Sequence, residues 1–140
     1  MKIAGLAGKP GVKPEEIPII VLAYLGDAVY ELFVRQYLIS HGPARIDKIH
    51  AEVVRYVRAD FQARVMRFLE ASLSEQEKAI VRRGRNAKRT HPAKGLKPEI
   101  DHYSTALETL IGFLYLKEEC QRLTEIMHLI MKQQGEGNLP

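Results

Sequence analysis

Hydrophobic residues recur along this chain at the three- and four-residue spacing of α-helices. Two stretches, 17–39 and 100–117, are apolar nearly all round and predict helices that pack on several sides. Residues 46–57 and 123–130 place charged positions between apolar ones at helical spacing, which predicts amphipathic helices. No useful length alternates with a period of two. The pattern therefore predicts an all-α fold of about six to seven helices.

Capping residues predict where several of these helices begin and end. Gly42, followed directly by proline, is typical of a helix end. Asp60 is interpreted as the N-cap of a further helix. Ser74 and Glu77 fit a capping box, so a helix is expected to start after Ser74 and to run toward Asn86.

The length of 140 residues indicates one domain, 1–140, with 1–13 and 135–140 expected to be flexible. The single cysteine excludes an internal disulfide, and the first residues do not resemble a secretion signal, which favours a cytoplasmic protein. The longest apolar run, 19–25, is far shorter than the roughly 20 residues that cross a bilayer, so no membrane segment is expected.

The positive charge is concentrated in one segment. Residues 78–98 contain eight lysines or arginines and no acid, whereas the other 13 basic residues are outnumbered by 17 acids. A basic cluster favours a polyanion such as a nucleic acid, because binding to phosphates releases condensed counterions; the alternative is a solvated loop. The candidate residues for binding such a polyanion are Arg82, Arg83, Arg85, Lys88, Arg89, Lys94 and Lys97.

Two acidic residues interrupt the two most apolar stretches. Asp27 and Glu108 each lie in an apolar helical run, where an unpaired buried charge would cost several kcal/mol. Gly26 precedes Asp27, and Gly112 follows Glu108 by one helical turn. If the two helices cross at these glycines, both carboxylates can reach one cation. A hard ion such as Mg²⁺ needs only one or two protein carboxylates beside waters and phosphate.

Each of these residues also has a purely structural explanation. Asp27 is alternatively a helix acid paired with Arg35, and Glu108 alternatively faces solvent. Glu31, four residues after Asp27, lies on the same side of the helix but is also correctly spaced to pair with Arg35. The residues alone leave these alternatives open.

The stretch Leu25-Gly26-Asp27-Ala28-Val29 resembles the signature helix of the ribonuclease III catalytic domain, and 107–116 resembles that family's second catalytic helix. The likeness extends over about 17–134 and matches a short branch without a double-stranded-RNA-binding domain. It implies a homodimeric, Mg²⁺-dependent endoribonuclease that cuts double-stranded RNA and leaves 5′-phosphate and 3′-hydroxyl ends. Asp27 and Glu108 would be the catalytic and metal-binding residues.

The resemblance is incomplete at two positions. Ala23 and Thr105 stand where the larger family usually has a glutamate and an aspartate, and Glu31 is a candidate outer-shell residue. The short branch implies precursor 23S ribosomal RNA of the large subunit as substrate, with a large-subunit ribosomal protein assisting. The alternative is a non-catalytic helical RNA-binding or ribosome-assembly module, which Ala23 and Thr105 would favour.

Overall fold

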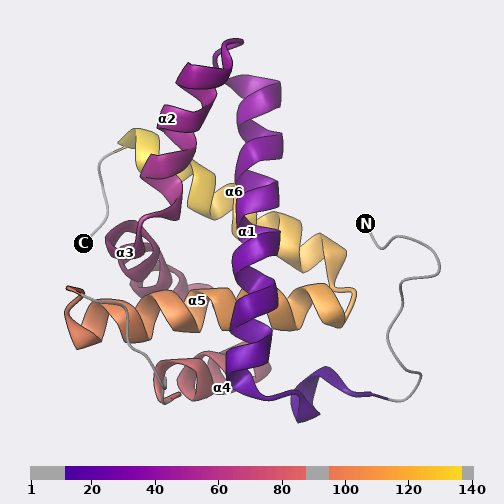
Figure 1. Cartoon of the computed structure of the whole chain (residues 1–140). Coiled ribbons are helices and arrows are strands. Elements are labelled where there is room, and N and C mark those ends of the chain that lie inside the picture. Colours follow the sequence, from indigo (N-terminus) through magenta and orange to yellow (C-terminus); the bar gives the residue numbers. More distant parts are fainter. Residues whose placement is uncertain (1–11, 88–94, 137–140) are drawn as a thin grey trace.

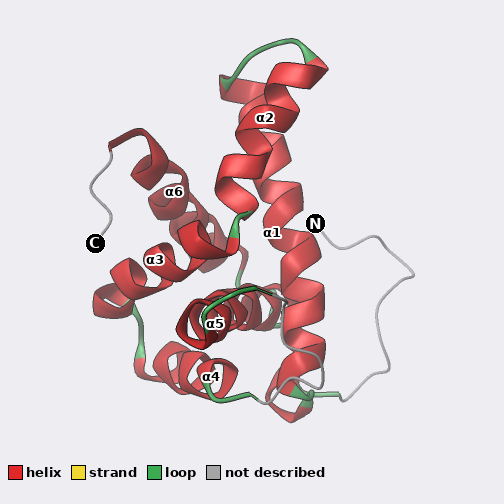
Figure 2. Cartoon of the chain, turned by 60° about the vertical axis from the view of Figure 1, so that its left-hand side comes forward, coloured by secondary structure: helices red, strands yellow, loops and turns green. Residues whose placement is uncertain are grey.

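Helix α5, Pro98–Leu116, lies at the centre of the computed structural model, with α1, α3, α4 and α6 packed around it (Figure 2). The structure describes residues 12–87 and 95–136. Eleven residues of α5 are buried, from Asp101 to Leu114, because its apolar positions lie on all sides. The most extensive contacts of α5 are with α1, followed by α4 and α3.

The other helices are connected by short segments. They are the 3₁₀ turn η1 (Pro14–Glu16), α1 (Ile19–His41), α2 (Ile46–Val57), α3 (Ala59–Leu69), the 3₁₀ turn η2 (Glu70–Ser72), α4 (Glu75–Arg85) and α6 (Cys120–Glu136). The described segments contain no strand, so the predicted all-α fold is confirmed. No helix within them is both long and apolar enough to cross a bilayer.

Helix α1 crosses α5 at a steep angle and continues well beyond it (Figure 1). Its C-terminal half packs against α2, which returns along it as the second arm of a helical hairpin. Tyr30 of α1 stabilises this hairpin, because its buried hydroxyl donates a 2.6 Å hydrogen bond to the carbonyl oxygen of Tyr56 in α2. The N-terminal half of α1 thus faces α5 and α4, and the C-terminal half faces α2.

Most predicted boundaries agree with the structure. The helix 46–57 has the predicted ends, and both hydrogen bonds of the Ser74–Glu77 capping box are present. The N-cap assigned to Asp60 was wrong, since Arg58 has the extended backbone of the N-cap and α3 begins at Ala59. Helix α6 continues to Glu136, and the segments 1–11 and 137–140, which contain most of the ends expected to be flexible, lie outside the described residues.

The expectation that helix 17–39 packs on several sides holds for the faces that contact α5, α2 and α4, but not for the whole helix. One face of α1 is solvent-exposed and apolar: Val21 is 52% exposed, Tyr24 83%, Leu32 57% and Ile39 71%. These residues recur at intervals of three, eight and seven and therefore form one stripe along the helix. The apolar pattern of α1 thus reflects two faces with different surroundings, and α5 is the enclosed helix.

Candidate active site

The backbones of α1 and α5 touch at two glycines. A Cβ atom at Gly26 would overlap the carbonyl oxygen of Glu108 and would lie 2.8 Å from the backbone nitrogen of Gly112. A Cβ atom at Gly112 would overlap the carbonyl oxygen of Leu22. Glycine costs a helix about 1 kcal/mol relative to alanine, and here the close approach explains both glycines. The predicted crossing at Gly26 and Gly112 is therefore observed.

This crossing brings the backbones of the two candidate acids together, because Asp27 directly follows Gly26, which lies against Glu108. Asp27 is exposed and Glu108 half-buried. The idea that Asp27 is stranded in an apolar environment was thus wrong: its position on the edge of α1 keeps the carboxylate in water. Burial, and then the neighbouring Tyr56 and Glu108, raise the pKa of Tyr30.

A shallow hollow lies beside Asp27 on the surface of α1. It has a volume of about 380 Å³ and is lined by Tyr24, Leu25, Asp27, Ala28 and Glu31. The carboxylate of Glu31 accepts a 2.9 Å hydrogen bond from Arg35, so the pairing that the sequence offered as an alternative for Glu31 is present. All five lining residues belong to α1 and Glu108 is not among them, so the hollow is an open surface beside Asp27 alone.

The positions one turn before each acid are buried and uncharged. Ala23 is 3% exposed and Thr105 2% exposed. The Oγ1 of Thr105 is the buried side-chain oxygen for which the described residues provide no hydrogen-bond partner, a situation that ordinarily costs about 1–3 kcal/mol. The sequence prediction missed one further acid on this face, Asp101, which is 6% exposed in the first turn of α5, where the helix dipole favours a negative charge.

The donor set suits a hard divalent cation. Carboxylates are the ligands that Mg²⁺ prefers, and an ion that keeps several waters needs only one or two of them. The described residues contain no group of three or more histidine, cysteine, aspartate or glutamate side chains that could hold a metal. A site here would consist of Asp27 and Glu108 completed by water and by the phosphate of a substrate.

The described cations of the basic segment lie at the end of α4 and just before α5. Arg82, Arg83 and Lys97 are exposed, while Arg83 donates to the carbonyl oxygen of Glu15 at 3.3 Å. Arg85 pairs with Glu70 at 3.4 Å and lies over the ring of Tyr103. Three predicted RNA-binding residues, Lys88, Arg89 and Lys94, lie outside the described residues. Of the predicted RNA-binding residues within the segments 12–87 and 95–136, Arg82 and Lys97 are those whose side chains have no hydrogen-bond or ion-pair partner there.

Three arginines on or between α2 and α3 are neutralised by nearby acids. Arg55 pairs with Glu52 at 3.2 Å, Arg58 pairs with Asp60 at 3.1 Å, and Arg67 pairs with Glu99. These three are better explained as the solvated side of surface helices, whereas Arg64 of α3 is exposed and has no ion-pair partner among the described residues.

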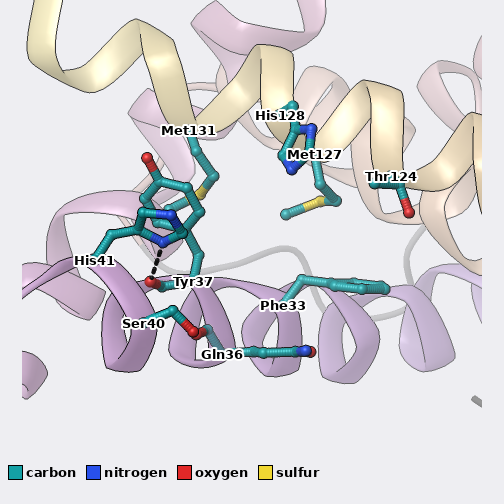
Figure 3. Close-up of a pocket in the computed structure, with 9 residues that line it drawn as sticks. All are labelled: Phe33, Gln36, Tyr37, Ser40, His41, Thr124, Met127, His128 and Met131. Atoms are coloured by element: carbon teal, nitrogen blue, oxygen red, sulfur yellow. Dashed lines mark hydrogen bonds between the residues drawn. The ribbon is translucent and has the colours of Figure 1, made fainter.

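A second hollow lies between α1 and α6, away from Asp27 (Figure 3). Its volume is about 240 Å³, and it is lined by Phe33, Gln36, Tyr37, Ser40, His41, Thr124, Met127, His128 and Met131. The rings of Tyr37 and His41 stack at 4.4 Å, and Nδ1 of His41 lies 3.1 Å from the carbonyl oxygen of Tyr37. With no carboxylate in its lining, this hollow is no alternative site for a magnesium ion.

Comparison with known proteins identifies the family of this chain. The family model described as "Ribonuclease III domain" matches residues 20–119, which include both acids and the helix crossing. Fold and site thus define an endoribonuclease domain of the ribonuclease III type.

Two curated relatives and one solved structure narrow this class. The Mini-ribonuclease 3 of Symbiobacterium thermophilum is 44% identical over 81% of this chain and 88% of its own length. The Mini-ribonuclease 3 of Synechocystis is 46% identical over 79% of this chain and 76% of its own length. A crystal structure of a Fusobacterium nucleatum protein superposes with a TM-score of 0.78 at 27% identity, covering 88% of this chain and 99% of that one. The chain belongs to the Mini-ribonuclease 3 branch of the ribonuclease III family. This membership favours an enzyme over a non-catalytic binding module.

Proposed function

We propose that this protein hydrolyses double-stranded RNA with a Mg²⁺ ion held between Asp27 and Glu108. The observation that supports the proposal is the contact of Gly26, the residue before Asp27, with the backbone carbonyl group of Glu108 on another helix. The coarser requirement for a divalent metal follows from the family, and Mg²⁺ is the ion that best fits two carboxylates and a phosphate.

The chain's own residues have distinct tasks in this reaction. The exposed carboxylate of Asp27 and the half-buried one of Glu108 would hold the ion, which when bound would supply charge stabilisation at the phosphate and a more acidic water. Tyr30, held by its hydrogen bond to Tyr56, has a raised pKa and therefore stays neutral beside Glu108. The products would carry 5′-phosphate and 3′-hydroxyl ends, as the resemblance to the family implies.

The RNA duplex is proposed to lie across the end of α4 and the start of α5. Arg82 and Lys97 are exposed there and uncompensated within the described segments, so they can neutralise phosphates and release counterions. Arg83, Arg85, Lys88, Arg89 and Lys94 complete the proposed RNA-binding set. The packing of Gly84 against Ala106 and Thr109 connects this basic end of α4 to the part of α5 that carries Glu108.

We further propose a homodimer that covers the apolar stripe of α1. Val21, Tyr24, Leu32 and Ile39 lie on the side of α1 opposite the α5 crossing, and leaving them in water is unfavourable. A second copy can present the same stripe across a two-fold axis, which would also match the local symmetry of an RNA duplex. Asp27 lies at the edge of this stripe, so each site would face the bound RNA from one side of the dimer.

The natural substrate is proposed to be precursor 23S ribosomal RNA in the cytoplasm, with a large-subunit ribosomal protein assisting on the RNA. This part rests on membership of the Mini-ribonuclease 3 branch. The whole of 1–140 is proposed to act as a single catalytic domain.

A cleavage assay tests the core of the proposal. Purified protein is incubated with an end-labelled RNA duplex, with Mg²⁺ or with EDTA, and with an equal amount of competing duplex DNA. Metal-dependent products with 5′-phosphate ends are expected, and DNA should not compete strongly. Binding without products under any metal condition would contradict the proposal and support a non-catalytic module.

A further inference from the structure

The hydroxyl of Thr105 behaves differently from the other buried hydroxyls of α5. Ser104 donates to the carbonyl oxygen of Asp101 at 3.2 Å, and Thr109 donates to the carbonyl oxygen of Thr105 at 2.7 Å. Both satisfy themselves within one helical turn. The Oγ1 of Thr105 has no partner in the described part of the chain, although the residue is only 2% exposed. Buried polar groups are normally hydrogen-bonded, so this hydroxyl is available to a bound water.

Its position in the fold indicates what that partner is. Thr105 precedes Glu108 by three residues, so the two lie next to each other on one face of α5. Gly112, where α1 crosses, lies on the same face. On α1 the residue one turn before Asp27 is Ala23, whose methyl group leaves the space beside the acids free of charge.

We propose that Thr105 is a positioning residue whose hydroxyl hydrogen-bonds a water molecule in the hydration shell of the divalent ion at Asp27 and Glu108. This inference rests on the proposed function. A hydroxyl can both accept and donate, so it can orient a water without adding charge. Thr105 would thereby hold a water at the position where a further carboxylate would otherwise lie. Groups that hold a metal's outer shell typically change its affinity by about 10-fold to 100-fold when they are removed.

The test measures metal binding in the absence of RNA. Mn²⁺ serves as the probe, and the free ion is followed by electron paramagnetic resonance in titrations of wild-type, Thr105→Val and Thr105→Ser protein. Thr105→Val keeps the shape but removes the hydroxyl, and should weaken Mn²⁺ binding about 10-fold. Thr105→Ser should bind like the wild type. Cleavage of duplex RNA against Mg²⁺ concentration should shift by the same factor for Thr105→Val and approach the wild-type rate at high Mg²⁺.

A matched control separates positioning from packing. Thr109→Val removes a buried hydroxyl from the same helix, but that hydroxyl is already bonded to the carbonyl oxygen of Thr105, so Mn²⁺ affinity should not change. Thermal unfolding in EDTA reports whether each variant is folded, and Thr105→Ala replaces Thr105→Val if the latter is not. Equal Mn²⁺ affinity in wild-type and Thr105→Val protein, or an equal loss in both valine variants, would overturn the role of Thr105.

The outcome for Thr105 is distinguishable from the outcome for the proposed function. If Asp27→Asn abolishes Mn²⁺ binding while Thr105→Val leaves it unchanged, the metal site stands and the role of Thr105 fails. If the wild-type protein neither binds Mn²⁺ nor cleaves RNA, the proposed function itself fails and the inference about Thr105 fails with it.

Discussion

Gly26 of α1 lies directly against the carbonyl group of Glu108 on α5, so the two helices that carry the candidate acids meet backbone to backbone. A Gly26→Ala substitution should lower the free energy of unfolding by about 3 kcal/mol, because its Cβ would force the helices apart. Alanine favours a helix by about 1 kcal/mol over glycine, so helix propensity alone predicts the opposite sign. Denaturant unfolding measures the change, and a stabilised variant would show that the contact is not tight.

Asp27→Asn and Glu108→Gln should each remove cleavage while leaving RNA binding close to wild type, because both keep the shape of the site and lose a metal-binding charge. Cleavage is followed with an end-labelled duplex, and binding by a shift assay in EDTA. Asp47→Asn and Glu52→Gln, which alter acids paired with arginines near or on α2, serve as controls. Normal turnover in either site variant would refute the assignment.

Replacing Arg82 and Lys97 together by alanine should weaken duplex binding and reduce the slope of log affinity against log salt by roughly 2 units, about 0.9 per lost phosphate contact. Arg45 and Arg55 are matched controls, since both are paired with acids and lie outside the proposed RNA surface. Titrations at several salt concentrations give the slopes. An unchanged slope in the Arg82 and Lys97 variant would place the RNA elsewhere.

Leu32→Glu should dissociate the proposed homodimer, because it places a charge in the middle of the apolar stripe of α1. Ile46→Glu is the matched control, since Ile46 is 79% exposed but lies at the start of α2. Sedimentation velocity over a range of protein concentrations reports the state of each. A wild-type protein that stays monomeric, or a dimer insensitive to Leu32→Glu, would exclude this interface.

The pair between Arg122 and Glu77 makes stability depend on acid pH. Nε and Nη2 of Arg122 donate to the two carboxylate oxygens of Glu77 at 2.8 and 2.9 Å. Burial raises the pKa of Glu77, but the hydrogen bonds from Arg122 and Ser74 outweigh it and hold the pKa below its ordinary value near 4.5. The stabilisation is therefore complete above that value and is lost as the pH falls through the lower folded-state pKa.

Arg122→Gln should consequently flatten the pH dependence of the unfolding temperature below about pH 4.5. At neutral pH it should cost about 2–3 kcal/mol, less than for a fully buried pair because Arg122 is partly exposed. Arg45→Gln breaks an exposed pair and should change stability by less than about 0.5 kcal/mol. Equal effects of the two substitutions would contradict the role assigned to Glu77.

Local patterns were sufficient for the helices and for the crossing at the acids. The Ser74–Glu77 capping box acts within one helical turn, so four neighbouring residues are enough to recognise it. Each glycine is recognisable as an unfavourable residue inside an apolar helix, and the contact between the helices explains it. The surroundings of α1 were not predictable in this way. The sequence shows that Tyr24 and Tyr30 lie on an apolar helix, yet Tyr24 is 83% exposed and Tyr30 1% exposed.

The remaining errors concern contacts between distant parts of the chain. Asp27 was expected to be buried because its sequence neighbours are apolar, whereas its exposure depends on where α2 and α5 pack around α1. The pairing of Glu77 with Arg122, 45 residues away, leaves no local signal either. Position along one helix can be inferred from spacing, but the side that meets solvent depends on the whole fold.

Gly26 and Glu108 touch through backbone atoms. The backbone spacing of the two candidate acids therefore does not depend on which side chains fill the interior. Aliphatic residues elsewhere in the core can exchange over evolution, or in a laboratory library, while the distance between the acids is retained. Engineering this enzyme for heat tolerance and altering its reactivity are therefore largely independent tasks, provided that both glycines are kept.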